Sequence, residues 1–250
     1  MKGKKVFWGI IMVVAMLVIA GATCFIVLHF FSDSDSKEYI KPTEATANPA
    51  LAENHNIDWH KLQEKNNDVY SWIYVPGTRI DHVVVQPDKG ESDLYYIDKN
   101  LDKNYEFAGT IFSERHNKKD YSDPVTVLYG HNMLNGGMFA TLHKFKNHKF
   151  FKKHKRMYVY QPHRKLTYKI YSAYTYDDRH IMNSFDFSDP KILKKYQKST
   201  LKPKALDKNV RKKTVLNQNS KILTLSTCTN GASNTRYLVQ GVLIKDEQTN

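Results

Sequence analysis

The sequence contains very few cysteines: among its 250 residues only Cys24 and Cys228 carry a thiol. Cys24 lies in a hydrophobic N-terminal stretch, so the remainder of the chain has a single thiol and cannot form a disulfide of its own. That remainder must therefore be stabilised by its own hydrophobic core. A leftover cysteine in an exported protein indicates either pairing with another chain or a reactive thiol.

Patterns typical of metal and phosphate binding are also missing. The eleven histidines do not fall at zinc-ligand spacing with acidic or thiol partners. Glu91, Asp93, Asp98 and Asp102 lack the regular spacing of a calcium loop, so we interpret them as part of a polar loop. No glycine-rich loop follows a predicted strand, as a phosphate site would require. We therefore expect chemistry without a cofactor or a bound metal.

The first part of the chain predicts a membrane anchor. Three lysines precede the apolar stretch Val6–Phe31, and acidic residues follow it. About 20 apolar residues suffice to cross a bilayer as a helix. The positive-inside rule places the N-terminus in the cytoplasm and the rest outside the cell membrane. A cleaved signal peptide is the alternative, but its apolar core has only about 7–15 residues. We interpret Cys24 as an apolar residue within this single membrane-spanning segment.

The composition divides the chain into three parts. Residues 1–31 are the predicted cytoplasmic tip and transmembrane helix, 32–55 a polar spacer, and 56–250 a single domain. The formal net charge is +13, which suits an exported domain that faces phospholipid heads or anionic wall polymer. Nucleic acid is not an expected partner, because the chain is exported and has no nucleic-acid-binding motif.

Short strands dominate the predicted secondary structure of the domain. Many short β-prone runs, few helices and no alternation of strands and helices favour a mostly antiparallel sheet closed into a barrel or sandwich. A short helix is expected within residues 57–69, capped by Asn56 or Asp58. The other expected strands are residues 72–75, 82–85, 107–112, 124–129, 157–160, 166–176, 222–227 and 237–244, and the other expected helices are 138–145 and 189–196.

Cys228 is the strongest candidate for a catalytic residue. It follows the β-prone run Ile222–Thr227 and precedes a polar turn, so it lies at a strand end that is rigid and still accessible. Side chains alternate along a strand, which places Thr224, Ser226 and Cys228 on one face. Such a polar floor suits a peptide substrate.

A thiol becomes a useful nucleophile when a base or a cation lies beside it. His131 directly follows the predicted strand at 124–129, so it too projects from a strand end. Arg236 opens the strand after the Cys228 turn, and a hairpin would return its guanidinium to the thiol, where it can hold an oxyanion or a substrate carbonyl. Five other histidines lie in basic, polar stretches and are interpreted as solvated surface: His143, His148, His154, His163 and His180.

Together these residues resemble a known family. The run Thr224-Leu225-Ser226-Thr227-Cys228 is similar to the Thr-Leu-x-Thr-Cys signature of sortases, and His131, Cys228 and Arg236 occur in the order of that family. The resemblance covers about residues 57–245. It is closest to class B sortases, from Trp72–Thr78, Ile111-Phe112 and the run that ends in Tyr129-Gly130-His131.

The resemblance implies an eight-stranded sortase-type β-barrel with a few peripheral helices, and a cysteine transpeptidase or peptidase on the surface of a Gram-positive bacterium. It implies that Cys228 forms the acyl-enzyme, that His131 handles the proton, and that Arg236 steadies the substrate or oxyanion. Ser226, Tyr95 and Ile181 are the expected substrate contacts.

The implied substrates are surface proteins with a C-terminal sorting signal, cleaved after threonine and transferred to an amine of a peptidoglycan precursor. Assembly of pilins through a lysine amine is the alternative within the family. Asp58-Trp59 only weakly matches the Asp-Pro-aromatic lid of some pilin-building sortases. A Cys-His peptidase or peptidoglycan hydrolase is less expected, because in the papain-like order the cysteine precedes the histidine. A non-enzymatic binding module for wall polymer would leave Cys228, His131 and Arg236 unexplained.

Overall fold

The computed structural model of the protein describes Met16 and residues 55–229 and 232–249. The predicted anchor at Val6–Phe31 lies outside these residues except for Met16, and so does nearly all of the spacer. Within the described residues, no helix is both long and apolar enough to cross a membrane. The division into anchor, spacer and domain stays a prediction.

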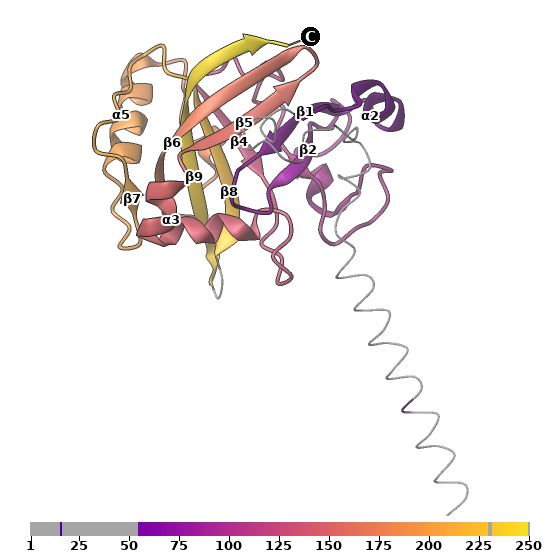
Figure 1. Ribbon diagram of the computed structural model, residues 1–250, viewed down its shortest axis with the longest axis horizontal. Helices are drawn as coiled ribbons and strands as arrows, with labels where there is room; N and C mark the ends of the chain where they lie inside the picture. Colours follow the sequence, from indigo (N-terminus) through magenta and orange to yellow (C-terminus); the bar gives the residue numbers. More distant parts are fainter. Residues whose placement is uncertain (1–15, 17–54, 230–231, 250) are drawn as a thin grey trace, which may run out of the picture. The chain divides into compact units, whose positions relative to one another are not determined.

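The described domain is a closed β-barrel (Figure 1). Its strands pair in the order β5-β1-β2-β3-β4-β8-β9-β6, and a β5–β6 pairing closes this ring of eight strands, while the short β7 pairs with β6 outside it. The predicted eight-stranded, mostly β fold is thus confirmed for this part of the chain. The strands are β1 (Val69–Tyr74), β2 (Asp81–Val85), β3 (Ile111–Phe112), β4 (Val125–Tyr129), β5 (Arg156–Gln161), β6 (Arg164–Asp177), β7 (Asn209–Val210), β8 (Ile222–Thr229) and β9 (Ala232–Gln248).

Short helices lie in the connections between the strands and before β1. They are α2 (Trp59–Lys65), α3 (His148–Lys153), α4 (Ile181–Ser184) and α5 (Pro190–Leu201), with the 3-10 helices η2 (Tyr95–Asp98) and η3 (Ala140–Lys146). Asp58 caps α2 by accepting a hydrogen bond from the Lys61 amide at 3.2 Å, as predicted. Asp189 caps α5 in the same way, and Pro190 fits its first turn because its φ is already helical.

Two apolar layers fix the wall formed by β4, β8 and β9. Leu223, Leu225 and Val239 point into the barrel and are fully buried. On the outer face, Leu193 and Tyr196 of α5 pack against this wall, on the left in Figure 1. Complete burial of a leucine side chain stabilises a fold by about 1.5–3 kcal/mol. Packing inside the barrel and packing against α5 on its outer face therefore both restrain the ends of β4 and β8.

Two predicted elements differ from the structure. The strand expected at 107–112 is reduced to Ile111–Phe112, because Gly109 turns the chain with a φ of +60° and lies so close to η2 that a Cβ there would be 2.3 Å from the Ile97 carbonyl oxygen. The helix expected at 138–145 forms as the 3-10 helix η3.

Candidate active site

Strand pairing brings the three predicted catalytic residues to one edge of the barrel. β4 and β8 run parallel with Tyr129 opposite Ser226, so both strands end at the same edge and present His131 and Cys228 there. β8 and β9 are antiparallel, and Cys228 lies opposite Arg236. All three residues line a single cleft of about 220 Å³. The other residues that line it are Leu94, Ile97, Thr110, Phe112, Glu114, Tyr129, Gly130, Tyr176, Asp178, Arg179, His180, Ile181, Ser226, Thr227 and Leu238.

Cys228 is an exposed free cysteine at the end of β8. The predicted alternation of β8 holds for Leu225, which is buried inside the barrel, and for Ser226 and Cys228, which line the cleft, but Thr227 between them lines the cleft as well. The register between β8 and β9 shifts immediately after Cys228. The thiol is therefore mounted at the last regular position of a strand that is anchored on both faces.

His131 is fixed from several sides. Its Nε2 lies 2.7 Å from the Ile97 carbonyl oxygen, and its ring stacks on Phe107 with centroids 5.8 Å apart and planes 13° apart. A carbonyl only accepts hydrogen bonds, so Nε2 carries the hydrogen in this arrangement. Gly130 before it has no room for a side chain, because a Cβ would lie 2.4 Å from Ile111 Cδ1. This close packing explains the glycine between Tyr129 and His131.

Arg236 contributes a permanent positive charge to the cleft. Its Nη1 donates to the Thr235 carbonyl at 3.2 Å. It also acts on the neighbouring Tyr129: burial raises the pKa of the Tyr129 hydroxyl, Glu114 raises it further, and the positive charge of Arg236 opposes that rise. Arg236 thus lies opposite Cys228 in the β8–β9 pairing, lines the same cleft, and acts on the Tyr129 hydroxyl.

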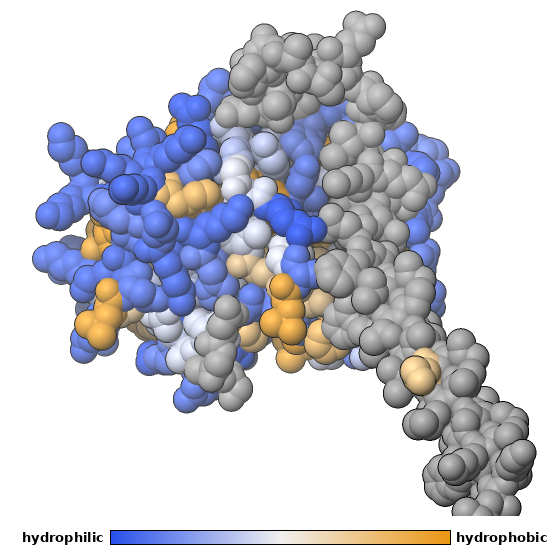
Figure 2. All heavy atoms as spheres, turned by 60° about the horizontal axis from the view of Figure 1, so that its bottom comes forward, coloured by the Kyte–Doolittle hydropathy of each residue, from blue (hydrophilic) through white to orange (hydrophobic). Residues whose placement is uncertain are grey.

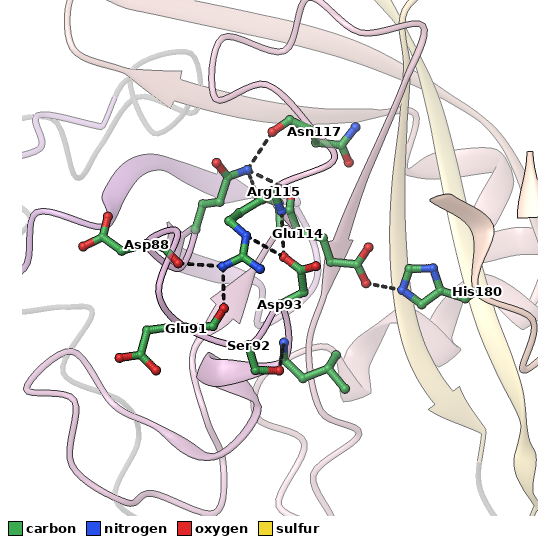
Figure 3. Close-up of polar contacts among 11 residues, drawn as sticks. Asp88, Glu91, Ser92, Asp93, Glu114, Arg115, Asn117 and His180 are labelled. Carbon is green, nitrogen blue, oxygen red and sulfur yellow. Dashed lines mark hydrogen bonds and ion pairs between the residues drawn. The ribbon is translucent and has the colours of Figure 1, made fainter. Parts of the chain in front are cut away.

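A buried acid was missed by the sequence analysis. The Glu114 side chain is 1% exposed, lines the cleft, and forms an ion pair with His180 of the loop between β6 and α4 (Figure 3). Burial raises the pKa of Glu114, and His180 opposes that shift. The next residue, Arg115, points toward the loop before η2, where it binds the carbonyl oxygens of Asp88 and Glu91 (Figure 3). The residues that follow β3 therefore contact both the loop that carries His180 and the loop before η2.

The expected substrate contacts are only partly on the cleft. Ser226 and Ile181 line it, the former 4% and the latter 3% exposed. Tyr95 is not among the lining residues; it packs edge-on against Tyr96 at a centroid distance of 5.0 Å. Its neighbours Leu94 and Ile97 line the cleft on that side.

The interpretation of five histidines as solvated surface was wrong for three of them. His143 contacts the Cys228 carbonyl, His154 stacks on Phe150 at 4.0 Å, and His180 pairs with Glu114. Each of these three side chains is partly buried. A segment rich in lysine can be exposed as a whole while one of its side chains packs against the barrel. His148 and His163 are exposed, as predicted.

The fold and the cleft agree with comparisons to known proteins. A sortase domain family model matches residues 73–244, which is more than half of the chain. The chain belongs to the sortase family. Sortase B of Listeria monocytogenes is 28% identical over 191 residues, which cover 73% of this chain and 72% of that protein.

Solved structures place this sortase beside class B members. The crystal structure of a mutant form of Clostridium perfringens sortase B is 34% identical, with a TM-score of 0.66 over 74% of this chain and 86% of that one. A Streptococcus pyogenes class B sortase involved in pilus biogenesis is 27% identical, with a TM-score of 0.61 over 75% of this chain and 98% of that one. The predicted class B-like character is confirmed.

Metal chemistry was not expected for this sortase. Among residues 55–229 and 232–249, no three histidine, cysteine, aspartate or glutamate side chains are grouped so as to hold a metal ion.

Proposed function

We propose that this sortase is a membrane-anchored transpeptidase in which Cys228 attacks the carbonyl that follows a threonine in a C-terminal sorting signal. The observation that carries the proposal is the convergence of an exposed thiol, an imidazole and a guanidinium on one cleft. Cys228 is the nucleophile, His131 transfers the proton, and Arg236 holds the substrate carbonyl as it becomes an oxyanion. Ser226 and Ile181 contact the bound peptide.

The steps balance without any cofactor. In the reactive form Cys228 is a thiolate and His131 carries the extra proton. The Cys228 Sγ forms a bond to the threonine carbonyl carbon, the peptide C–N bond breaks, and the departing amine takes the proton from His131. The amine of the acceptor then attacks the thioester and gives its proton to His131, the new amide forms, the C–S bond breaks, and Cys228 is released as the thiolate. Because Nε2 of His131 donates to Ile97, Nδ1 is the nitrogen that exchanges the proton.

The surface of the domain supports a location at the outer face of the cell membrane. The chain carries a formal net charge of +13, and the coloured part of the face in Figure 2 is largely hydrophilic with separate hydrophobic patches. A basic surface favours the zone next to anionic phospholipids and wall polymers. We propose that the segment at 6–31 anchors it there with the N-terminus in the cytoplasm.

The favoured acceptor is an amine of a peptidoglycan precursor, and a pilin lysine is the second candidate. The relative involved in pilus biogenesis supports the second. The Asp58-Trp59 pair supports the first, because Asp58 caps α2 and neither residue lines the cleft, so these two residues supply no lid.

The transferase activity is tested by offering the acyl-enzyme several different amine acceptors. We expect an added amine to release the acyl-enzyme faster than water does, because a thioester retains enough reactivity to acylate an amine. Full-length protein in detergent is incubated with a labelled sorting peptide and with a glycine peptide, a wall stem peptide or a pilin domain, and ligated products are identified by mass. Ligation to wall peptides favours anchoring, ligation to pilin lysine favours pilus assembly, and hydrolysis alone with every acceptor contradicts the transferase proposal.

Removal of the buried charge at Glu114 is expected to weaken peptide binding. Glu114→Gln keeps the shape but loses the ion pair that holds His180 and the adjoining Ile181 on the cleft wall. A hydrogen bond to a charged group contributes about 1.5–3 kcal/mol, and the partial exposure of His180 reduces this, so we expect KM to rise roughly threefold to tenfold while kcat changes less than twofold.

The control is the Lys245–Glu247 pair, a surface ion pair of 2.6 Å on β9 whose residues do not line the cleft. Glu247→Gln is expected to change KM less than twofold, because surface pairs contribute little. Steady-state kinetics of both variants give the KM and kcat values that this prediction compares. Equal KM values for wild type and Glu114→Gln would show that Glu114 does not shape the cleft.

A further inference from the structure

The 3-10 helix η3 contacts the backbone of both proposed catalytic residues. The Phe139 amide, at the N-terminal end of η3, donates to the His131 carbonyl at 2.9 Å. Four residues later, His143 Nε2 lies 3.1 Å from the Cys228 carbonyl oxygen. A carbonyl only accepts, so His143 donates this hydrogen bond. One short segment thus holds the strand ends that carry the imidazole and the thiol.

His143 is itself held in a fixed position. Its ring packs against Tyr237, the residue after Arg236, with centroids 5.0 Å apart and planes 37° apart. Its neighbours Leu142 and Phe145 are fully buried in the barrel core, so the helix cannot slide. Burial lowers the pKa of His143, the hydrogen bond to the Cys228 carbonyl opposes this, and Lys146 lowers the pKa further. A neutral ring with its hydrogen on Nε2 is the form that fits this site.

The bond from His143 lies where β8 needs support. The register between β8 and β9 shifts between Cys228 and Thr229, so the regular ladder changes at the nucleophile. A donor on the Cys228 carbonyl restrains the peptide plane that follows the thiol. Catalysis through a covalent intermediate depends on such restraint, because a misplacement of about 1 Å can cost about 100-fold in rate.

We propose that His143 is a positioning residue that fixes the end of β8, so that η3 sets the distance between the Cys228 thiol and His131. His143 acts through the Cys228 backbone and does not exchange a proton with the substrate. This inference rests on the proposed role of Cys228 as the nucleophile. It adds a second histidine to the machinery of this sortase, one that holds the nucleophile in place.

Three variants separate the hydrogen bond from the packing. His143→Gln keeps an N–H donor at about the position of Nε2 but loses the ring, His143→Phe keeps the ring against Tyr237 but loses the donor, and His143→Ala loses both. His60→Ala is the matched control, since the His60 side chain is 83% exposed on α2. The full-length protein in detergent is assayed with a pool of fluorogenic peptides that share a fixed threonine, and thermal melting checks that each variant folds.

We expect kcat to fall roughly 10-fold to 100-fold in His143→Ala and His143→Phe, with KM within about threefold of wild type. His143→Gln is expected to stay within threefold of wild-type kcat, and His60→Ala to match wild type. A substrate-free readout runs in parallel: alkylation of Cys228 by iodoacetamide at pH 7, followed by mass spectrometry, should be at least threefold slower in the alanine and phenylalanine variants only.

Other results overturn the inference. If His143→Phe retains wild-type kcat and alkylation rate, or if His143→Gln is impaired as much as His143→Phe, the hydrogen bond does not position the thiol. Failure of the proposed function has a different signature, namely peptide cleavage that persists in Cys228→Ala or is missing in wild type. In that case the alkylation rates alone decide whether His143 positions Cys228.

Discussion

Replacement of Cys228 by alanine is expected to abolish cleavage of sorting-signal peptides. The side chain is exposed at the end of β8 and is the proposed nucleophile, so its loss should remove the covalent route entirely and not merely slow it. Turnover of Cys228→Ala should fall to the rate of the uncatalysed peptide, measured by chromatography of the cleavage products. Cys24→Ala, which removes the other thiol of the chain, is the matched control and should keep full activity.

The comparison of these two variants is decisive for the nucleophile. Because both lose one thiol, an effect of general oxidation or of cysteine removal would appear in both. Cleavage that survives in Cys228→Ala above the uncatalysed rate would assign the chemistry to another group of the cleft, and the transpeptidase account would then lose its first step.

Arg236→Lys is expected to lose roughly 100-fold to 1,000-fold in kcat although the positive charge is kept, the amount typical for removal of one oxyanion donor. Arg236 lies opposite Cys228 in the β8–β9 hairpin and lines the cleft. Its planar guanidinium offers a fixed fork of donors, whereas a lysine offers a point charge on a flexible stem. Steady-state kinetics of the purified full-length variant measure the loss.

Arg156→Lys controls for the substitution itself. Arg156 is an exposed arginine at the start of β5, away from the residues that line the cleft, so its replacement should leave kcat within about twofold, as surface substitutions ordinarily do. Near-wild-type turnover of Arg236→Lys with an unchanged melting temperature would show that Arg236 does not serve as an oxyanion donor and is only a charged residue on the strand.

The positions of Cys228, the proposed nucleophile, and of its neighbours could be predicted from sequence because the relevant information is local. Alternation along Ile222–Thr227 predicts that Ser226 shares a face with Cys228 and that Leu225 does not, and the structure agrees for these residues. The placement of His131 and Arg236 at strand ends is also a local property. Which strands pair is not local, and only the parallel alignment of β4 with β8 brings His131 and Cys228 to the same edge.

The supporting residues could not be predicted in this way. Glu114 and His180 are 66 residues apart, and His143 and Cys228 are 85 residues apart. Neither pair has a pattern of spacing that marks it, because each contact depends on how loops outside the barrel fold back on it. A histidine among lysines is typical of a solvated surface, and nothing in the local sequence around His143 and His180 indicates their contacts with Cys228 and Glu114.

The central claim is that Cys228 carries the acyl group of the sorting signal between cleavage and transfer. It is tested most directly by mass spectrometry of proteolytic fragments after full-length protein is mixed with a threonine-containing sorting peptide. The account predicts an added mass, equal to the peptide portion that ends in threonine, on the fragment that contains Cys228, and its loss when an acceptor amine is added. Cleavage with no adduct on that fragment, or an adduct on another residue, would contradict the account.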